Sequence, residues 1–268
     1  MDQKTKAETF AGLHTGGKIL ILPNAWDAAS AAVMADAGAR AVATSSAAVA
    51  WAHGYPDGDA LPIPKLLATI EAVARVVAVP VTADIEGGYT DDLGRLGETI
   101  RAVIGAGAVG INLEDGRRDP DLHARKVAAA RHAADATGVP LFINARTDVY
   151  LKGLAEGEAA FAEAVRRAEL YRAAGADGIF IPGPSDPQLI GRLVAHVALP
   201  LNIMLLPALG DAASLQSLGV RRVSSATAPF RCAYATVARA VAAFLADGDP
   251  AAFATGAEGL GNLNTRFA

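Results

Sequence analysis

Two short signatures alternate along the chain, and each marks the end of a helix and the start of an apolar run. The first is Ala-Gly-Ala or a close variant, at residues 37–39, 106–108, 174–176 and, in a degraded form, 218–220. The second is a proline between two apolar residues, at 79–81, 139–141 and 199–201. Glycine commonly ends a helix, and proline is tolerated where a strand begins because its missing N–H does least harm there. The pattern therefore predicts regular alternation of helices and strands.

With residues 18–22 as the first strand, the pattern predicts eight strands separated by Ala-rich helices. The strands read as almost continuously apolar, as in residues 76–81, which is typical of parallel strands covered on both faces. We therefore predict an α/β fold, a closed (β/α)8 TIM barrel formed as a single domain by residues 1–268. A doubly wound sheet is the alternative, but no Gly-x-Gly-x-x-Gly motif follows the first strand.

Polar residues gather where the predicted strands end, and barrels of this kind place their chemistry at the carboxyl ends of the strands. In chain order the ends fall at residues 24–26, 44–46, 84–86, 112–115, 144–148, 182–183, 202–204 and 224–225. Acidic residues concentrate on the third, fourth and fifth of these ends, whereas the opposite ends carry Pro, Gly and Ala. We therefore expect a functional site at this rim.

Asp84 and Glu86 are two residues apart, so an extended chain would place both side chains on one face. Neighbouring carboxylates repel each other, and a hard divalent cation relieves that repulsion. Glu114, at the next strand end, supplies a further oxygen ligand. The sequence thus predicts Mg²⁺, with Mn²⁺ as an alternative, held by Asp84, Glu86 and Glu114 with water. A solvated acidic pair at the start of a loop is the other interpretation.

Arg146 follows the fifth strand, and its planar guanidinium suits a substrate carboxylate or phosphonate, or serves as a counter-ion for the acids. Asp148 is expected to hold it in place. Residues 44–47, Thr-Ser-Ser-Ala, either offer backbone N–H groups to an oxyanion or form an ordinary turn. Metal, arginine and backbone donors together suit the enolate formed when a 2-oxo acid loses the bond beyond C3.

Composition restricts the class of partner. The formal net charge of −4 argues against nucleic acid or an anionic membrane as a partner. No run approaches the ~20 apolar residues of a membrane span, and the N-terminus lacks the apolar core of a signal peptide. The single cysteine, Cys232, excludes an internal disulfide and suits a cytoplasmic protein; its apolar helical surroundings predict inert core packing.

Several other residues have open interpretations. His14, His123, His132 and His196 are expected on helix surfaces, without the spacing of a zinc site, whereas His53 lies in a loop that could reach the rim. Trp26 either packs or lines the pocket. Arg117 and Arg118 form either a lid over an anionic substrate or a solvated loop face. Residues 256–268, with three glycines, predict a loose tail or a subunit contact.

Six motifs, in order, make nearly the full chain resemble the isocitrate lyase/phosphoenolpyruvate mutase superfamily. They are Pro-Asn-Ala-Trp-Asp at 23–27, Thr-Ser-Ser-Ala at 44–47, Gly-Tyr-Pro-Asp at 54–57, Asp-Ile-Glu-Gly-Gly-Tyr at 84–89, Asn-Leu-Glu-Asp at 112–115 and Asn-Ala-Arg-Thr-Asp at 144–148. The resemblance implies a (β/α)8 barrel whose last helix is often exchanged between subunits. It also implies a homo-oligomer, a tetramer or dimer, that uses Mg²⁺ and binds 2-oxo acids or enolpyruvate.

The resemblance also implies roles for individual residues. Asp84 matches the direct metal ligand, while Glu86 and Glu114 would act mostly through water. Asp57 matches an acid on the second loop, so the catalytic candidates are Asp57, Glu114 and Arg146. Arg146 matches the substrate-clamping arginine, and residues 45–47 match the segment whose amides hold the substrate. The substrate-binding candidates are therefore Trp26, Thr44, Ser45, Ser46, Ala47, Arg146 and Asn202.

The loop after the fourth strand departs from the superfamily lyases. Isocitrate and methylisocitrate lyases carry a Lys-Lys-Cys-Gly-His-type loop with a catalytic cysteine, whereas residues 115–120 read Asp-Gly-Arg-Arg-Asp-Pro. The Asn- and Lys-bearing loop of the mutase and of phosphonopyruvate hydrolase is also absent, and the sixth strand ends in Pro182-Gly183 where relatives place Glu or His. We therefore expect decarboxylation or cleavage of an oxaloacetate-like acid through a pyruvate enolate. Phosphonate chemistry and non-catalytic 2-oxo acid binding are the alternatives.

Overall fold

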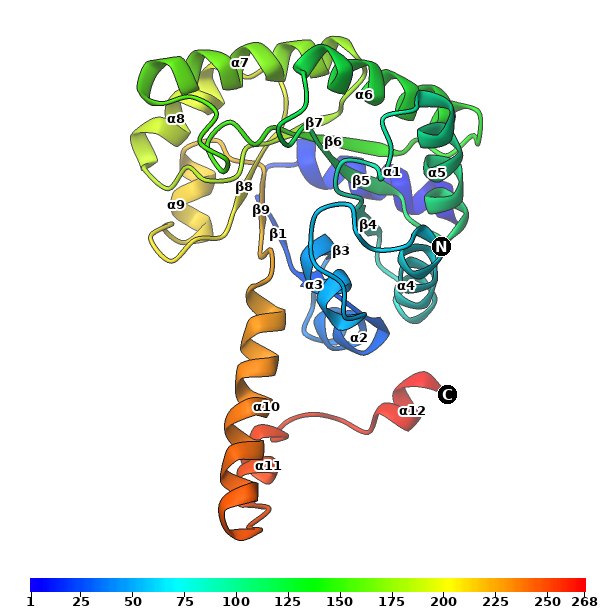
Figure 1. Ribbon diagram of the computed structural model, residues 1–268, viewed down its shortest axis with the longest axis vertical. Helices are drawn as coiled ribbons and strands as arrows, with labels where there is room; N and C mark the ends of the chain where they lie inside the picture. Colours follow the sequence, from blue (N-terminus) through cyan, green and yellow to red (C-terminus); the bar gives the residue numbers. More distant parts are fainter.

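The computed structural model describes residues 1–268 and contains a nine-stranded parallel sheet that curls into a barrel (Figure 1). The order of the strands in the sheet is β1-β9-β8-β7-β6-β5-β4-β3-β2. Their bounds are β1 Leu20–Leu22, β2 Asn24–Ala25, β3 Val42–Thr44, β4 Val81–Asp84, β5 Gly110–Glu114, β6 Phe142–Arg146, β7 Gly178–Phe180, β8 Leu201–Met204 and β9 Arg222–Ser224.

The first predicted strand, residues 18–22, corresponds to β1, and the strand continues beyond Pro23 as β2. The β1 half pairs with β9 and the β2 half pairs with β3, so the strand changes partner at the proline. The Pro23 carbonyl still accepts a hydrogen bond from the Ala43 N–H (3.0 Å). Because β1 and β2 are consecutive in the chain, they bring the two ends of the sheet together, and the (β/α)8 TIM barrel is confirmed.

Helices surround this sheet. The bounds are α1 Gln3–Thr15, α2 Ala28–Asp36, α3 Ser46–Ala52, α4 Ile63–Val76, α5 Leu93–Gly105, α6 Pro120–Asp135, α7 Gly157–Ala173, α8 Pro187–His196, α9 Ala212–Ser217, α10 Ala228–Asp247, α11 Ala251–Gly256 and α12 Leu263–Phe267. The main core of 40 buried residues includes Ile111, Ile143 and Ile203 of the strands together with apolar residues of the helices around them. A smaller cluster joins Phe10 of α1 to Leu20 and Phe142 of the strands.

Three predictions about burial or boundaries were wrong. Residues 76–79 do not belong to a strand: α4 continues to Val76, and β4 begins only after Pro80. Cys232 is exposed on α10 instead of packing in the core, because this helix leaves the barrel. His14 and His123 are buried, not on helix surfaces, since they face Phe142 and Tyr171 respectively.

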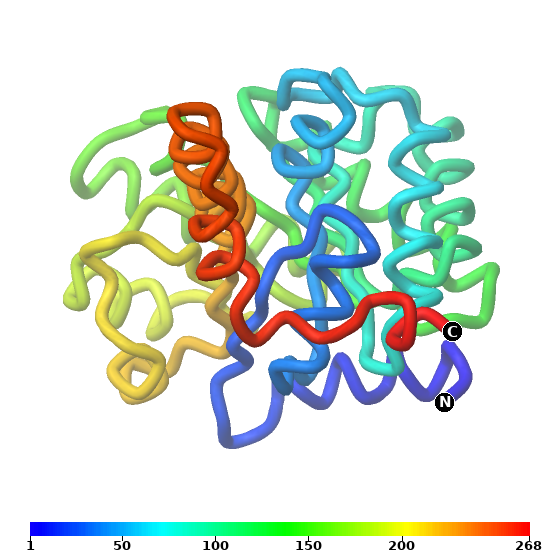
Figure 2. The backbone as a smooth tube through the Cα atoms, turned by 90° about the horizontal axis from the view of Figure 1, so that it is seen from below, coloured from blue at the N-terminus to red at the C-terminus, as the bar shows by residue number.

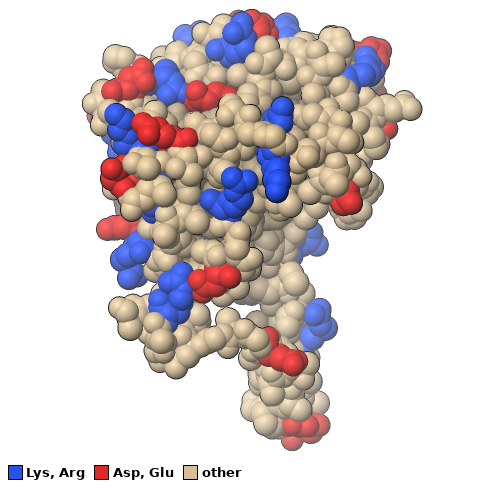
Figure 3. Space-filling view, turned by 180° about the vertical axis from the view of Figure 1, so that it is seen from behind, with Lys and Arg blue, Asp and Glu red and all other residues tan.

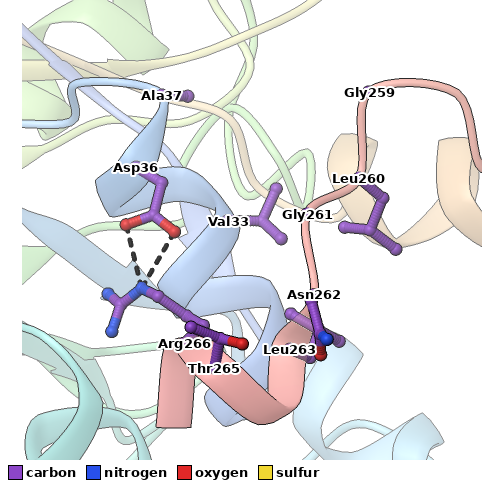
Figure 4. Close-up of a pocket in the computed structure, with 10 residues that line it drawn as sticks. All are labelled: Val33, Asp36, Ala37, Gly259, Leu260, Gly261, Asn262, Leu263, Thr265 and Arg266. Carbon is purple, nitrogen blue, oxygen red and sulfur yellow. Dashed lines mark hydrogen bonds and ion pairs between the residues drawn. The ribbon is translucent and has the colours of Figure 1, made fainter.

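The C-terminal part of the chain forms an arm. Helix α10 projects away from the barrel with α11 against it, and the tail then returns toward α2 (Figures 1 and 2). Arg266 of α12 contacts both carboxylate oxygens of Asp36 at 2.9 and 3.0 Å, at the edge of a cleft between α2 and the tail (Figure 4). The tail is therefore attached to the barrel at this point, and exchange of the last helix between subunits stays a prediction.

The surface carries no dominant charge on the face shown in Figure 3, where acidic and basic side chains are interspersed and the arm has few of either. None of the helices combines the length and the apolar character that crossing a membrane would require.

Candidate active site

Asp84 is the last residue of β4 and is held by the neighbouring strand end. Its backbone N–H donates to the buried Thr44 Oγ1 (2.9 Å), and its Oδ2 accepts from the Ser46 Oγ (2.9 Å) and N–H (3.3 Å). Asp84 Oδ1 is buried and accepts no hydrogen bond. A buried carboxylate oxygen without a partner is costly unless something compensates it, so this atom is a candidate ligand for a cation.

Glu86 does not share a face with Asp84. The strand ends at Asp84, and Glu86 has a φ of 51°, so the alternation of an extended chain stops here. The Glu86 side chain turns to the preceding loop, where Oε2 accepts from the N–H groups of Gly58 (2.8 Å) and Asp59, and Oε1 accepts from the Tyr89 hydroxyl (3.1 Å). Glu86 therefore anchors the 54–61 loop above the barrel.

Glu114 and Arg146 face each other at the ends of paired strands. The registered partners Glu114 and Arg146 form an ion pair between Oε2 and Nη1 (2.8 Å). Asp148 binds the same guanidinium through Oδ1 and Nε (2.7 Å), as the sequence predicted. Lys152 Nζ completes the group at 3.2 Å from Asp148 Oδ2 and 3.7 Å from Glu114 Oε1. Two acids and two bases thus form one ionic network at this rim.

The carboxyl groups around Asp84 resist ionisation. Burial raises the pKa of Glu114 to about 7, with the charges of Asp148 and Asp84 adding to the effect and Arg146 opposing it. Burial is also the main cause of the raised pKa values of Asp57 and Glu86, and in both the negative charge of Asp84 contributes. The negative charge of Asp84 therefore contributes to the raised pKa of all three acids. No three side chains of the types that ligate metals, however, lie close enough together to hold an ion directly.

The other predicted binding residues occupy different places. Ser45 caps α3 by accepting from the Ala48 N–H (3.4 Å), and Ala47 lies in the first turn of that helix. Trp26 packs edge-on against Phe230 of α10, with ring centroids 5.2 Å apart, which supports the interpretation of Trp26 as a packing residue. His53 bonds to Thr69 of α4 through Nε2 (3.1 Å).

Asn202 lies below the rim, inside the barrel, where a hydrogen-bonded layer crosses four strands. Asn144 Nδ2 donates to Asn112 Oδ1 (2.9 Å) and to Asn202 Oδ1 (3.1 Å), while Asn202 Nδ2 donates to Ser224 Oγ (3.2 Å). The buried Arg222 donates through Nη2 to Asn112 Oδ1 (3.1 Å). Asn112 and Asn144 stand two residues before Glu114 and Arg146 on the same strands, so this layer supports the rim.

Some residues of the rim were missed by sequence reasoning. Asp59 accepts from the N–H groups of Gly87 and Tyr89 (both 3.2 Å), and Arg118 joins Asp59 (2.7 Å) to Asp91 (2.8 Å). Arg118 is thus neither a free lid nor a solvated residue, because its ion pairs connect the loops that carry Asp59 and Asp91. No sequence motif pointed to Lys152 as a residue of the rim, because its position depends on the turn that follows β6.

A family model described as phosphoenolpyruvate phosphomutase matches residues 10–245. An uncharacterized protein of Mycobacterium tuberculosis (strain H37Rv) is 33% identical over 245 residues, which cover 90% of each chain. Oxaloacetate decarboxylase 1 of Pseudomonas fluorescens (strain Pf0-1) is 31% identical over 209 residues, which cover 73% of this chain and 70% of the relative.

Solved structures agree with this fold. A Burkholderia cenocepacia J2315 protein, provisionally named a phosphonomutase, is 44% identical with a TM-score of 0.85, over 88% of this chain and 98% of that chain. A phosphonopyruvate hydrolase in complex with oxalate and Mg²⁺ is 26% identical with a TM-score of 0.81, over 91% of this chain and 88% of that chain.

Proposed function

We propose that this chain, which belongs to the phosphoenolpyruvate phosphomutase family, is a Mg²⁺-dependent lyase that cleaves a C–C bond in an oxaloacetate-like 2-oxo dicarboxylic acid. The observation that carries the proposal is Asp84 Oδ1, a buried oxygen without a partner among acids that repel one another, on the rim that also carries Arg146. The similarity to an oxaloacetate decarboxylase supports the choice of substrate.

The residues present fit a hard cation such as Mg²⁺. Asp84 would be the direct ligand through Oδ1, while Glu86 and Glu114 would act through water, because their carboxylates already bind the loop and Arg146. When bound, Mg²⁺ would supply Lewis-acid stabilisation of the negative charge that develops on the keto oxygen of the substrate. Mn²⁺ has the same ligand preference and could replace it.

The chain's own residues would bind and orient the substrate. Arg146 uses Nε and Nη1 for its acids, which leaves Nη2 to donate to the carboxylate at C1. The strand-to-helix turn of residues 44–47 would offer the Ala47 N–H to the developing enolate oxygen, since Ser46 and Thr44 are occupied in positioning Asp84. Asp57, whose raised pKa keeps its proton to higher pH, would protonate the enolate carbon.

The first prediction tests the metal site. Asp84→Asn keeps an oxygen acceptor for Ser46 but removes the charge, so we expect Mg²⁺-dependent binding of oxalate, a mimic of the pyruvate enolate, to be lost in calorimetry. Pyruvate formation from oxaloacetate should fall by more than about 100-fold. Asp121→Asn, the same change at an exposed position on α6, is the control. Unchanged oxalate binding by Asp84→Asn would refute the assignment.

Phosphonate chemistry is the second candidate, and the 44% identity to a provisionally named phosphonomutase favours it. Assays of the same protein with phosphonopyruvate would distinguish it from decarboxylation. Turnover of phosphonopyruvate but not of oxaloacetate would establish this alternative. Oxalate binding without turnover of either would instead indicate a non-catalytic binder of 2-oxo acids.

A further inference from the structure

Lys152 has a fixed backbone at the mouth of the barrel. Its N–H donates to the Asp148 carbonyl (2.9 Å), and its own carbonyl accepts from Arg117 Nη2 (3.2 Å). The side chain remains 35% exposed, compared with 14% for Arg146. One cation of the rim is therefore deep, and the other faces solvent from a preorganised turn.

Arg146 and Lys152 lie close together because both of them contact the same two carboxylates. Glu114 binds Arg146 through Oε2 (2.8 Å) and approaches Lys152 through Oε1 (3.7 Å). Asp148 binds Arg146 through Oδ1 (2.7 Å) and approaches Lys152 through Oδ2 (3.2 Å). The two cations thus contact different oxygens of the same two carboxylates, an arrangement that suits the two ends of a short diacid.

Because most of the charged groups at the rim are acidic, the position of Lys152 matters for the binding of an anion. Asp57, Asp84, Glu114 and Asp148 face Arg146 and Lys152, and Arg118 is already paired with Asp59 and Asp91. An anion at the mouth would meet mainly acidic groups, and Lys152 is a partly exposed cation that contacts two of them. Burial raises the pKa of Asp57 on the 54–61 loop, and the charge of Lys152 is among the influences that oppose this rise, so Lys152 also acts on that loop.

We infer that Lys152 binds the distal carboxylate of the diacid while Arg146 holds the C1 end, and that it thereby selects short 2-oxo diacids over monoacids. The inference rests on the proposed function. The distal carboxylate still carries its charge when the C–C bond begins to break, so a contact with it stabilises the bound substrate and the transition state to a similar extent. Lys152 is therefore a specificity residue that acts on KM more than on kcat.

The test compares two ligands in the presence of Mg²⁺ by calorimetry. Oxalate has no distal group, whereas malate is a four-carbon diacid that lacks the keto group needed for decarboxylation. Lys152→Gln should weaken binding of the diacid by about tenfold and that of oxalate by less than about twofold. Lys152→Arg should restore most of the diacid affinity, and the KM for oxaloacetate should rise in Lys152→Gln with little change in kcat. Lys18→Gln, the same change at an exposed lysine before β1, is the control.

Two outcomes would overturn the inference. An equal loss of affinity for oxalate and for the diacid would mean that Lys152 only holds Glu114 and Asp148 in place. Unchanged diacid binding in Lys152→Gln would mean that it does not contact the substrate. If the wild-type protein failed to bind oxalate with Mg²⁺, the proposed function itself would fall, and this inference with it.

Discussion

Arg222 is a fully buried guanidinium whose side-chain hydrogen bond goes to an amide, not to a carboxylate. Its Nη2 donates to Asn112 Oδ1, whereas Nε and Nη1 make no hydrogen bond within the chain. Burial lowers its pKa to about 9, with the charge of Asp84 opposing the shift. A buried charge without an ion-pair partner destabilises a protein, and replacing such groups by apolar side chains of similar volume is often neutral or stabilising.

We therefore expect Arg222→Met to raise the free energy of unfolding, by about 1–2 kcal/mol. Asn112 Oδ1 would keep the hydrogen bond from Asn144, so no buried acceptor is left without a partner. Urea denaturation measures the change. Arg221→Met, at the neighbouring position where the guanidinium is exposed, is the matched control and should change stability by less than about 0.5 kcal/mol. A clear loss of stability in Arg222→Met would contradict the prediction.

Sequence reasoning placed some rim residues better than others, for a local reason. Asp84, Glu114 and Arg146 end strands, and in a parallel barrel every strand end reaches the same rim, so counting strands was enough to bring them together. Glu86 lies just beyond its strand and has a positive φ, and no pattern in the sequence predicts this change in the course of the backbone. Lys152 depends on a turn held by hydrogen bonds, which sequence alone does not reveal.

At the scale of elements, the glycine and proline signatures predicted the order of strands and helices because both residues act through their own backbones. The helix between the first two strands of the alternation is α2, Ala28–Asp36, and it is capped by Asp27. The apolar content of residues 76–79 was misleading, because valines can end a helix as well as form a strand. Burial of a helix face is harder to predict, since it depends on which neighbour covers it.

The two buried histidines make helices α1 and α6 sensitive to acid. His14 stacks on Phe142 with ring centroids 4.0 Å apart, and His123 packs edge-on against Tyr171 at 4.6 Å. Burial is the main cause that lowers both pKa values to about 3, and Arg222 adds to the effect at His14, as Lys126 does at His123. Both rings therefore stay neutral in the folded protein at pH values where the unfolded chain protonates them.

The sign of the pH dependence follows from this difference. Between pH 6.5 and about 3 the unfolded chain binds more protons, so stability is complete above pH 6.5 and falls as the pH decreases. At pH 5 each histidine should lower the free energy of unfolding by roughly 2 kcal/mol. His123→Phe should make the decline between pH 7 and pH 5 shallower in urea titrations. His132→Phe, on the exposed face of α6, should leave it unchanged; equal slopes for both variants and wild type would refute the explanation.

At the scale of the whole molecule, the arm presents an apolar stripe that the single chain covers only in part. Tyr234, Val237, Val241 and Phe244 are all exposed on α10. Their spacing of three and four residues places them on one side of the helix. The arm projects from the barrel instead of packing on it, so these side chains are accessible to a further contact (Figure 1). This exposure supports the expectation that the chain forms a homo-oligomer in which α10 is buried.

A substitution on the stripe would test that expectation. Val237→Glu combined with Val241→Glu would introduce charges that cannot be buried without a large free-energy penalty, so the oligomer should dissociate into smaller species in sedimentation velocity. Both valines are exposed in the single chain, so the circular dichroism spectrum should be retained. Ala246→Glu, which adds a charge to an exposed position on the opposite side of α10, should leave the oligomer intact. If the double variant kept the wild-type mass, α10 would not lie in the interface, and the apolar stripe would need another explanation.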